Sequence, residues 1–144
     1  MAANTTSVLI IKLAEKLTHQ FNERLTRFEI QPKHFRILFL LTHWGPLSQV
    51  ELGQHTKTDR APMVHLIDHL ERLGLVERTL NPSDRRVKTI NLTDRGRDVA
   101  EQTLQLAHAV EAEVLAPLSD EESRQLNTLL SGLMPEHFSP ELRT

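Results

Sequence analysis

Two neighbouring stretches decide the fold: "TDRAPMVHLIDHLERLG" at 58–74 and "NPSDRRVKTINLTDRG" at 81–96. In the first, Thr58 or Asp59 is placed to cap a helix, and Gly74 is placed to end it. The apolar side chains recur with the spacing of one helical face, at Met63, Leu66, Ile67 and Leu70. This pattern predicts an amphipathic helix that packs one face on a core and leaves the other free.

The second stretch predicts a β-hairpin. Turn-forming residues separate two extended segments, 75–79 and 87–92, and place Arg85 and Arg86 near the projecting tip. An arginine on such a projection can enter the narrow minor groove of A·T-rich DNA, where the negative potential is strongest. Asp84 can hold the guanidinium in orientation. The alternative interpretation of these residues is a basic turn that is only solvated.

A helix-turn-helix is predicted around the first stretch. Ser48 can cap a short preceding helix, with Glu51 three residues further on as its capping-box partner. The second helix of such a motif fits the major groove, and its N-terminal side chains meet base edges. The candidate DNA contacts are therefore the first-turn and outward side chains of this helix and the charged residues of the hairpin: Arg60, Ala61, Pro62, Val64, His65, His69, Asp84, Arg85, Arg86 and Lys88.

Charge is distributed unevenly along the chain. The formal net charge is -2 and the pI is near 6.4, which by itself argues mildly against a nucleic-acid partner. The segment 57–97 is nevertheless net positive, and acidic residues dominate from Asp98 onward. A particle polarised in this way can orient one face toward a polyanion.

The remaining pattern is mainly helical, and 144 residues suit a single domain, 1–144. The stretch from Pro32 to Gly45 is apolar on almost every side, which predicts a central buried helix. The run 8–11 is also apolar all round but lies on the first helix, so we expect a partner chain to cover it. Since this run is too short for a signal peptide or a membrane span, we expect a cytoplasmic protein with no membrane association.

Catalytic and metal-binding functions are not favoured. The chain has no cysteine, which excludes disulfides, thiol redox sensing and thiolate zinc sites. His65 and His69 have a spacing able to bind a metal, but the His-Glu-x-x-His pattern is absent because no glutamate follows His65. No glycine-rich phosphate loop or nucleophile elbow is found either. We predict a protein that is not an enzyme and has no cofactor and no metal site.

The two opening stretches, taken in order, resemble the MarR family of transcriptional regulators. "DRAPMVHLIDHLERLGLVER" is similar to the recognition helix of that family and its Gly-Leu-Val junction. "NPSDRRVKTINLTDRG" is similar to its Asp-x-Arg wing and its Leu-Thr-x-x-Gly closing turn. "LSDEESRQLNTLL" at 118–130 resembles the last helix of the family. Histidine at 65 and 69 departs from the family, in which arginine is common at both positions.

This resemblance implies a dimeric winged helix-turn-helix protein that binds double-stranded DNA. It implies a DNA-binding lobe at about 32–97, dimerisation helices at about 5–30 and 98–135, and a palindromic operator bound by a homodimer. Arg86 is then the minor-groove residue and Asp84 its orienter. We expect a transcriptional regulator, a repressor more than an activator, that is released by a small-molecule effector.

The resemblance also implies an effector cleft between the dimer region and the DNA-binding lobe, with a small aromatic or carboxylate ligand as the expected class. Candidate groups for this cleft lie on the first two helices: His19, Arg36, His43 and Trp44. For Trp44 and Arg36 the alternatives are a core position and a surface ion pair. Two other functions stay open, a winged helix used only for protein association and a metal-responsive regulator of the same fold.

Overall fold

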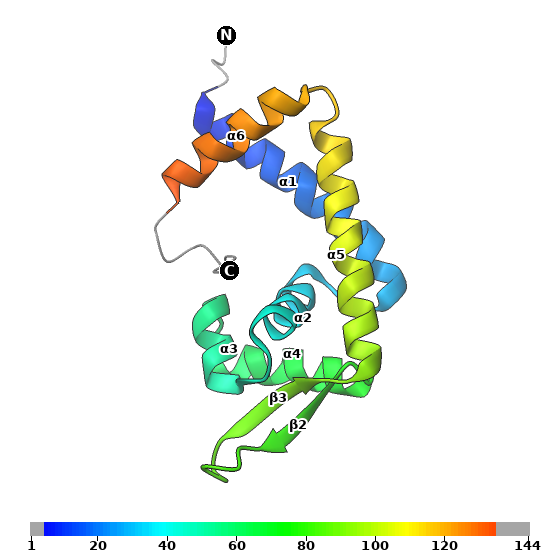
Figure 1. Ribbon diagram of the computed structural model, residues 1–144, viewed down its shortest axis with the longest axis vertical. Coiled ribbons are helices and arrows are strands. Elements are labelled where there is room, and N and C mark those ends of the chain that lie inside the picture. Colours follow the sequence, from blue (N-terminus) through cyan, green and yellow to red (C-terminus); the bar gives the residue numbers. More distant parts are fainter. Residues whose placement is uncertain (1–4, 135–144) are drawn as a thin grey trace.

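The computed structural model describes residues 5–134 of the chain and consists mainly of helices around a small sheet (Figure 1). The elements in chain order are α1 (Thr6–Leu25), a 3-10 turn η1 (Thr26–Phe28), α2 (Pro32–Trp44), β1 (Leu47–Ser48), α3 (Gln49–Thr56), α4 (Arg60–Arg72), β2 (Val76–Leu80), β3 (Lys88–Leu92), α5 (Asp94–Leu115) and α6 (Asp120–Leu133). The mainly helical winged-helix fold is thereby confirmed. Position 135, the predicted end of the second dimerisation segment, and the acidic residues beyond it lie outside the described part.

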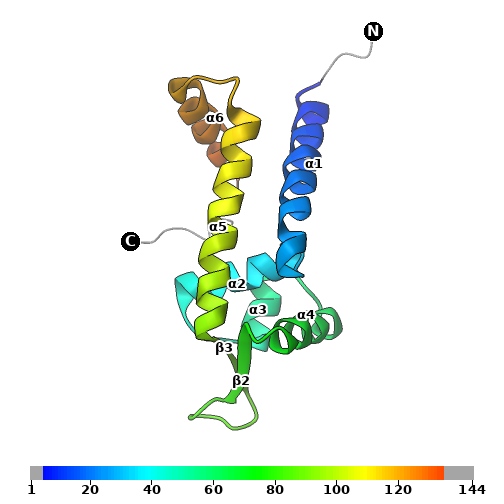
Figure 2. The same cartoon turned by 90° about the vertical axis from the view of Figure 1, so that its right-hand side faces the viewer.

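The molecule has a small lobe and a long helical arm. The lobe contains α2, α3, α4 and the sheet, and the hairpin of β2 and β3 projects from its far end (Figures 1 and 2). Two long helices, α1 and α5, rise from the lobe, and α6 extends away from the upper end of α5 (Figure 1). We use "lobe" for α2 through β3 and "arm" for α1, α6 and residues 101–115 of α5.

The central helix α2 has the predicted ends and the predicted burial. Pro32 occupies its first position, Gln31 and His34 form a capping box, and Gly45 ends it at φ 76. A positive φ costs glycine little because it has no Cβ. The helix buries side chains on most of its faces, including Ile37, Leu38, Leu40 and Leu41. Around this helix the other lobe elements assemble one continuous core.

The sheet is antiparallel with the order β1-β3-β2. Strands β2 and β3 begin one residue later than the hairpin predicted from the sequence. The two-residue strand β1 was not predicted. It forms because Leu47 pairs with Ile90, and this pairing buries both side chains in the lobe core.

The joint between lobe and arm is built at the first turn of α5. Thr93 caps the helix by accepting a hydrogen bond from Gly96 N at 3.0 Å, and its hydroxyl donates to Gly74 O at 2.6 Å. A Cβ at Gly96 would lie 1.9 Å from Leu75 O, so only glycine fits this contact. Helix α5 then runs on without a break past the predicted boundary at 97–98, so a single helix belongs to both regions.

The arm leaves apolar side chains in solvent. Leu25 is the buried residue of α1, and α6 contains none. Exposed apolar residues gather on the first turns of α1 and along α6: Val8, Leu9, Ile10, Ile11, Leu129, Leu133 and Met134. No helix in the described range 5–134 is long and apolar enough to cross a membrane.

Candidate nucleic-acid interface

The predicted helix-turn-helix is present as α3 and α4. Ser48 caps α3 by accepting from Glu51 N at 3.1 Å, and the Glu51 carboxylate accepts from Ser48 N at 2.7 Å. Helix α3 ends at Thr56, the next residue Lys57 adopts a left-handed conformation with φ 50, and α4 begins after Asp59. The turn is further held by a hydrogen bond from Thr58 N to Gly53 O at 2.9 Å. These local contacts fix the angle at which α4 leaves α3.

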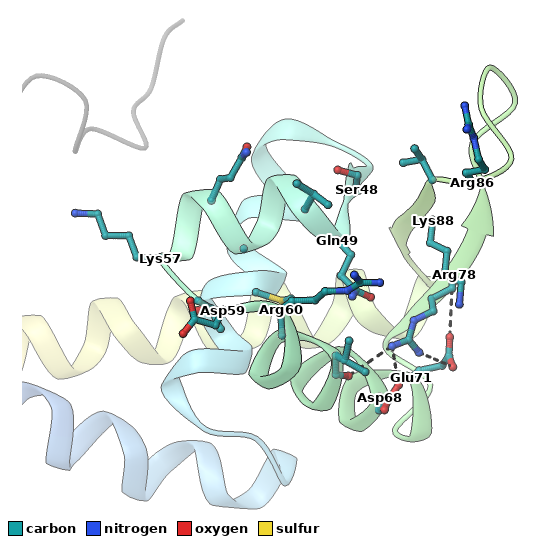
Figure 3. Close-up of a pocket in the computed structure, with 17 residues that line it drawn as sticks. Ser48, Gln49, Lys57, Asp59, Arg60, Asp68, Glu71, Arg78, Arg86 and Lys88 are labelled. Atoms are coloured by element: carbon teal, nitrogen blue, oxygen red, sulfur yellow. Dashed lines mark hydrogen bonds and ion pairs between the residues drawn. The ribbon is translucent and has the colours of Figure 1, made fainter.

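An open groove of about 1110 Å³ lies between α3, α4 and the hairpin (Figure 3). Its lining includes Ser48 and Gln49 at the start of α3. Five cationic side chains line it as well, with Lys57 at one end and Arg86 at the other: Lys57, Arg60, Arg78, Arg86 and Lys88. The lining combines these charges with the small and apolar side chain of Val64, a mixture able to meet both phosphates and base edges.

Arg86 is held near the tip of the hairpin and points into solvent. Its Nε donates to Asp84 Oδ1 at 3.3 Å, and its backbone N donates to the same oxygen at 3.0 Å. The Arg86 side chain is 92% exposed. Arg85 beside it is also exposed. The predicted geometry of Asp84 as the group that orients Arg86 is thus present in the structure.

The candidate residues of α4 do not all face the groove. Arg60 and Val64 line it, and Ala61 and Pro62 are exposed in the first turn of the helix. His65 is exposed and does not line the groove; it lines an adjoining depression with Asp68, Glu71 and Arg72, of which Asp68 and Glu71 also line the groove. The outward face predicted for α4 therefore has two parts, with Val64 on the groove side.

His69 does not point outward, and this part of the sequence interpretation is wrong. Its Nε2 lies 2.6 Å from Glu29 O, and its ring is 4.6 Å from the His34 ring between centroids. Since a carbonyl only accepts, His69 Nε2 carries the proton of this bond. The contact depends on Glu29, which takes a left-handed conformation with φ 59 after η1. A long-range contact of this kind is not visible in the helical periodicity.

His34 is a buried polar residue next to this contact. Its Nδ1 accepts a hydrogen bond from Gln31 N at 3.0 Å, and the side chain is almost fully covered. Burial, and then the proximity of His69, lower the pKa of His34 to about 4. The ring is therefore neutral near pH 7, as an acceptor in a helix cap must be.

Arg78 on β2 is a residue of the groove that the sequence analysis missed. Its guanidinium donates to Asp68 at 2.6 Å and to Glu71 at 3.1 Å, both on α4 (Figure 3). Strand alternation was the available signal, because Arg78 lies two residues after the buried Val76 and so shares the face that packs toward the lobe.

The four effector candidates fall into two groups. Arg36 Nη2 donates to His55 O at 3.3 Å, and the Trp44 ring meets the His55 ring edge-on at 4.3 Å, so these two are brought together at α3. His43 Nδ1 lies 2.9 Å from Phe39 O, and His19 pairs with Glu23, each within its own helix. His55 was not singled out from the sequence and is the residue that links the first group.

No group of three or more histidine, aspartate or glutamate side chains within residues 5–134 is arranged to hold a metal ion. The side chains of His65 and His69 have different surroundings, because His65 is exposed and His69 Nε2 is hydrogen-bonded to Glu29 O. The spacing noted in the sequence is therefore not a shared face for one ion.

Known proteins with a similar sequence and fold come from one family. Residues 30–88 match the model of the MarR family. The reduced form of MarR from E. coli is 28% identical, with a TM-score of 0.83 over 91% of this chain and 97% of that chain. A mutant E. coli MarR complexed with operator DNA is 29% identical, with a TM-score of 0.77 over 88% and 91%. A probable transcriptional regulator from Pseudomonas aeruginosa is 25% identical, with a TM-score of 0.79 over 93% and 100%.

Proposed function

We propose that the chain is a winged-helix transcriptional regulator of the MarR family, which binds a palindromic operator as a homodimer and represses transcription until a small molecule releases it. The match of residues 30–88 to the family model and the similarity to E. coli MarR support this proposal. The observation that carries the DNA-binding part is the cationic groove between α3, α4 and the hairpin. Its two ends offer different contacts. Helix α4 presents Arg60 and Val64 toward a major groove, and the hairpin presents Arg86 toward the adjacent minor groove.

The residues of the proposed DNA interface follow from this placement. They comprise the first turn and outward positions of α4 together with the hairpin tip: Arg60, Ala61, Pro62, Val64, His65, Asp84, Arg85, Arg86 and Lys88. Within this set Asp84 acts on Arg86 and not on DNA, since its carboxylate already accepts two hydrogen bonds from that residue. His69 is left out of the proposal because it is engaged with Glu29.

The experiment begins with selection of the genomic fragments that the protein retains, which supplies an operator. Replacement of Arg86 by Ala should then lower operator affinity by roughly tenfold or more, because a base-groove arginine contributes ~1–3 kcal/mol. The matched control is Arg124→Ala on α6, where an exposed arginine pairs with Glu121 far from the groove. Affinity that is equal for wild type and Arg86→Ala would remove the wing from the interface.

The dimer part of the proposal rests on the arm. The apolar side chains on α1 and α6 are 38% to 72% exposed, and burial of such a patch between two copies is the usual way to remove it from water. Two reading helices in one dimer then meet successive major grooves, ~10 bp apart. Sedimentation should give a dimer at micromolar concentration, and an operator that binds equally well with one half-site would contradict this arrangement.

The effector part rests on Arg36 and Trp44 at His55, a cation and an aromatic ring within one small region. A small aromatic carboxylate fits this pair, because arginine can hold the carboxylate and the ring can stack. Trp44 is the one tryptophan of the chain, so its fluorescence reports ligand binding at this place. Salicylate and nicotinate are suitable probes, and Arg36→Gln should abolish the fluorescence response while leaving operator binding unchanged. An unchanged response in that variant would place the effector elsewhere.

A further inference from the structure

The groove contains acidic side chains as well as basic ones. Asp68 and Glu71 line it from α4, opposite the hairpin. Asp59, near Lys57, is the third carboxylate of the lining. The two carboxylates beside the hairpin would repel the phosphates of a DNA backbone in this groove, and the repulsion acts over the ~8–10 Å of the Debye length. Some other feature of the groove must offset this charge if α4 and the hairpin are to approach DNA together.

Both carboxylates are engaged by one side chain. Arg78 Nη2 donates to Asp68 Oδ1 at 2.6 Å, and Arg78 Nη1 donates to Glu71 Oε1 at 3.1 Å. The backbone N of Arg78 also donates to Glu71 Oε2 at 3.3 Å. A guanidinium can serve two carboxylates at once because its donors are fixed in a planar fork, whereas a lysine ammonium presents a single point of charge.

Arg78 is itself poorly placed to touch DNA. Its side chain is 17% exposed, while Asp68 and Glu71 are 47% and 44% exposed. The arginine is thus less exposed than the two carboxylates, and it reaches from the hairpin with both terminal nitrogens directed at α4 (Figure 3). The neighbouring cations, Arg86 and Lys88, remain on the solvent side of the hairpin and are exposed.

We infer that Arg78 is a positioning residue for the proposed DNA binding: it cancels the charge of Asp68 and Glu71, so that the reading helix and the hairpin can approach DNA together. The inference rests on the proposed function. Its distinctive part is the charge cancellation. If the ion pairs served only to hold the hairpin against α4, operator binding would require the two carboxylates. If Arg78 serves to cancel their charge, operator binding tolerates the loss of all three residues together.

The test compares three variants on the selected operator at fixed ionic strength. Arg78→Gln should weaken binding by about tenfold or more, since it leaves two uncompensated carboxylates in the groove. Asp68→Asn with Glu71→Gln, with Arg78 kept, should bind as tightly as wild type or severalfold more tightly. The triple variant that combines all three changes should return to within about threefold of wild type.

Charge cancellation and a mechanical tie predict opposite changes in the operator affinity of the double variant. If the three residues act only as a mechanical tie, the double variant binds more weakly than wild type and the triple variant is as weak as Arg78→Gln, and either result overturns the inference. If Arg78→Gln does not fold, as judged by thermal unfolding, the double and triple variants still decide the question through their own affinities.

A matched control separates the groove from surface charge in general. Arg124→Gln on α6 also removes an arginine from a carboxylate, Glu121, and should leave operator affinity unchanged. Failure of the proposed function itself is recognised separately, because wild type would then retain no DNA fragment in low salt, whatever the variants do.

Discussion

The lobe and the arm of this protein differ in how far they bury their apolar side chains. In the lobe, every element from α2 to β3 contributes to one buried core, and its exposed apolar side chains are few. In the arm, α6 buries none of its residues and the first turns of α1 leave four consecutive apolar side chains exposed. A single chain therefore completes the lobe but not the arm, which is the pattern expected when the lobe meets DNA and the arm meets a second copy.

A pair of glycines provides the sharpest way to break this comparison. Gly96→Ala should destabilise the protein by about 4 kcal/mol or more, because the new Cβ would lie 1.9 Å from the backbone oxygen of Leu75. Relief of this clash requires a shift of the backbone at one of the two positions. On α6, a Cβ at Gly132 meets nothing within 4 Å. Gly132→Ala should instead stabilise its helix by roughly 0.5–1 kcal/mol.

Urea unfolding of the two variants beside wild type measures both effects. The result that would contradict the packing at the lobe–arm joint is a Gly96→Ala protein as stable as Gly132→Ala. If Gly132→Ala lowered the free energy of unfolding, other residues would have to pack against α6 more closely than in the single chain. Sedimentation of that variant would then show whether those residues belong to a partner copy.

A pair of leucines extends the comparison to the core. Leu70 on α4 is fully buried, whereas Leu129 on α6 is 69% exposed. Leu70→Ala should lower the free energy of unfolding by about 2–5 kcal/mol through lost burial and a residual cavity. Leu129→Ala should raise the dimer dissociation constant roughly tenfold, since burial of a leucine contributes ~1.5–3 kcal/mol.

The two leucine variants need different measurements, unfolding by denaturant for Leu70→Ala and sedimentation over a range of concentrations for Leu129→Ala. An unchanged association constant for Leu129→Ala would take α6 out of the proposed dimer interface. An unchanged unfolding free energy for Leu70→Ala would conflict with the burial of this residue in the lobe.

The sequence predicted the features that depend on local interactions. The ends of α2 and the cap of α3 follow from residues within one turn of them, such as Pro32, Gly45 and Ser48, and each was confirmed. The hairpin was placed to within one residue for the same reason. Local rules were enough here because capping and turn preferences act over three or four residues.

Features that depend on long-range contacts were missed. The direction of His69 is set by Glu29, forty positions away in the chain, and by the ring of His34. The strand β1 exists because Leu47 meets Ile90. The role of Arg78 depends on two carboxylates of another element. The periodicity of a sequence assigns each side chain to a face of its helix or strand, but it does not identify the residue that packs against that face. These three contacts were therefore found only in the structure.

His34 gives the lobe a pH dependence of stability. Burial and the nearby His69 lower its pKa in the folded protein to about 4, below the value of 6.5 for an unfolded chain. The unfolded state therefore takes up a proton first as the pH falls, so this stability is fully present above pH 6.5 and is lost progressively down to about pH 4. The loss should be roughly 3 kcal/mol at most, because one pKa unit corresponds to ~1.4 kcal/mol.

The measurement is urea unfolding at several pH values between 7 and 4. His34→Gln should remove this part of the pH dependence, because a glutamine can take the place of His34 in the capping box and does not titrate. The control is His108→Gln, an exposed position on α5 in the arm, which should keep the slope of wild type. Equal slopes for His34→Gln and wild type would contradict the assignment of this effect to His34.

The smallest expected effect comes from two capping boxes of the same chemistry. Ser48 and Glu51 cap α3 in the lobe, and Ser119 and Glu122 cap α6 in the arm, with hydrogen bonds of 2.7 to 3.2 Å in both. Loss of either serine should cost about 1 kcal/mol of stability. Only Ser48 also lines the groove, so Ser48→Ala should lower operator affinity severalfold, whereas Ser119→Ala should leave it unchanged. Since the two substitutions remove the same cap, any difference in DNA binding between them reports the position of α3 beside the DNA and not the loss of helix stability. Equal operator affinities in gel-shift titrations would show that the start of α3 is not part of the interface, and the comparison between lobe and arm would then rest on α4 and the hairpin alone.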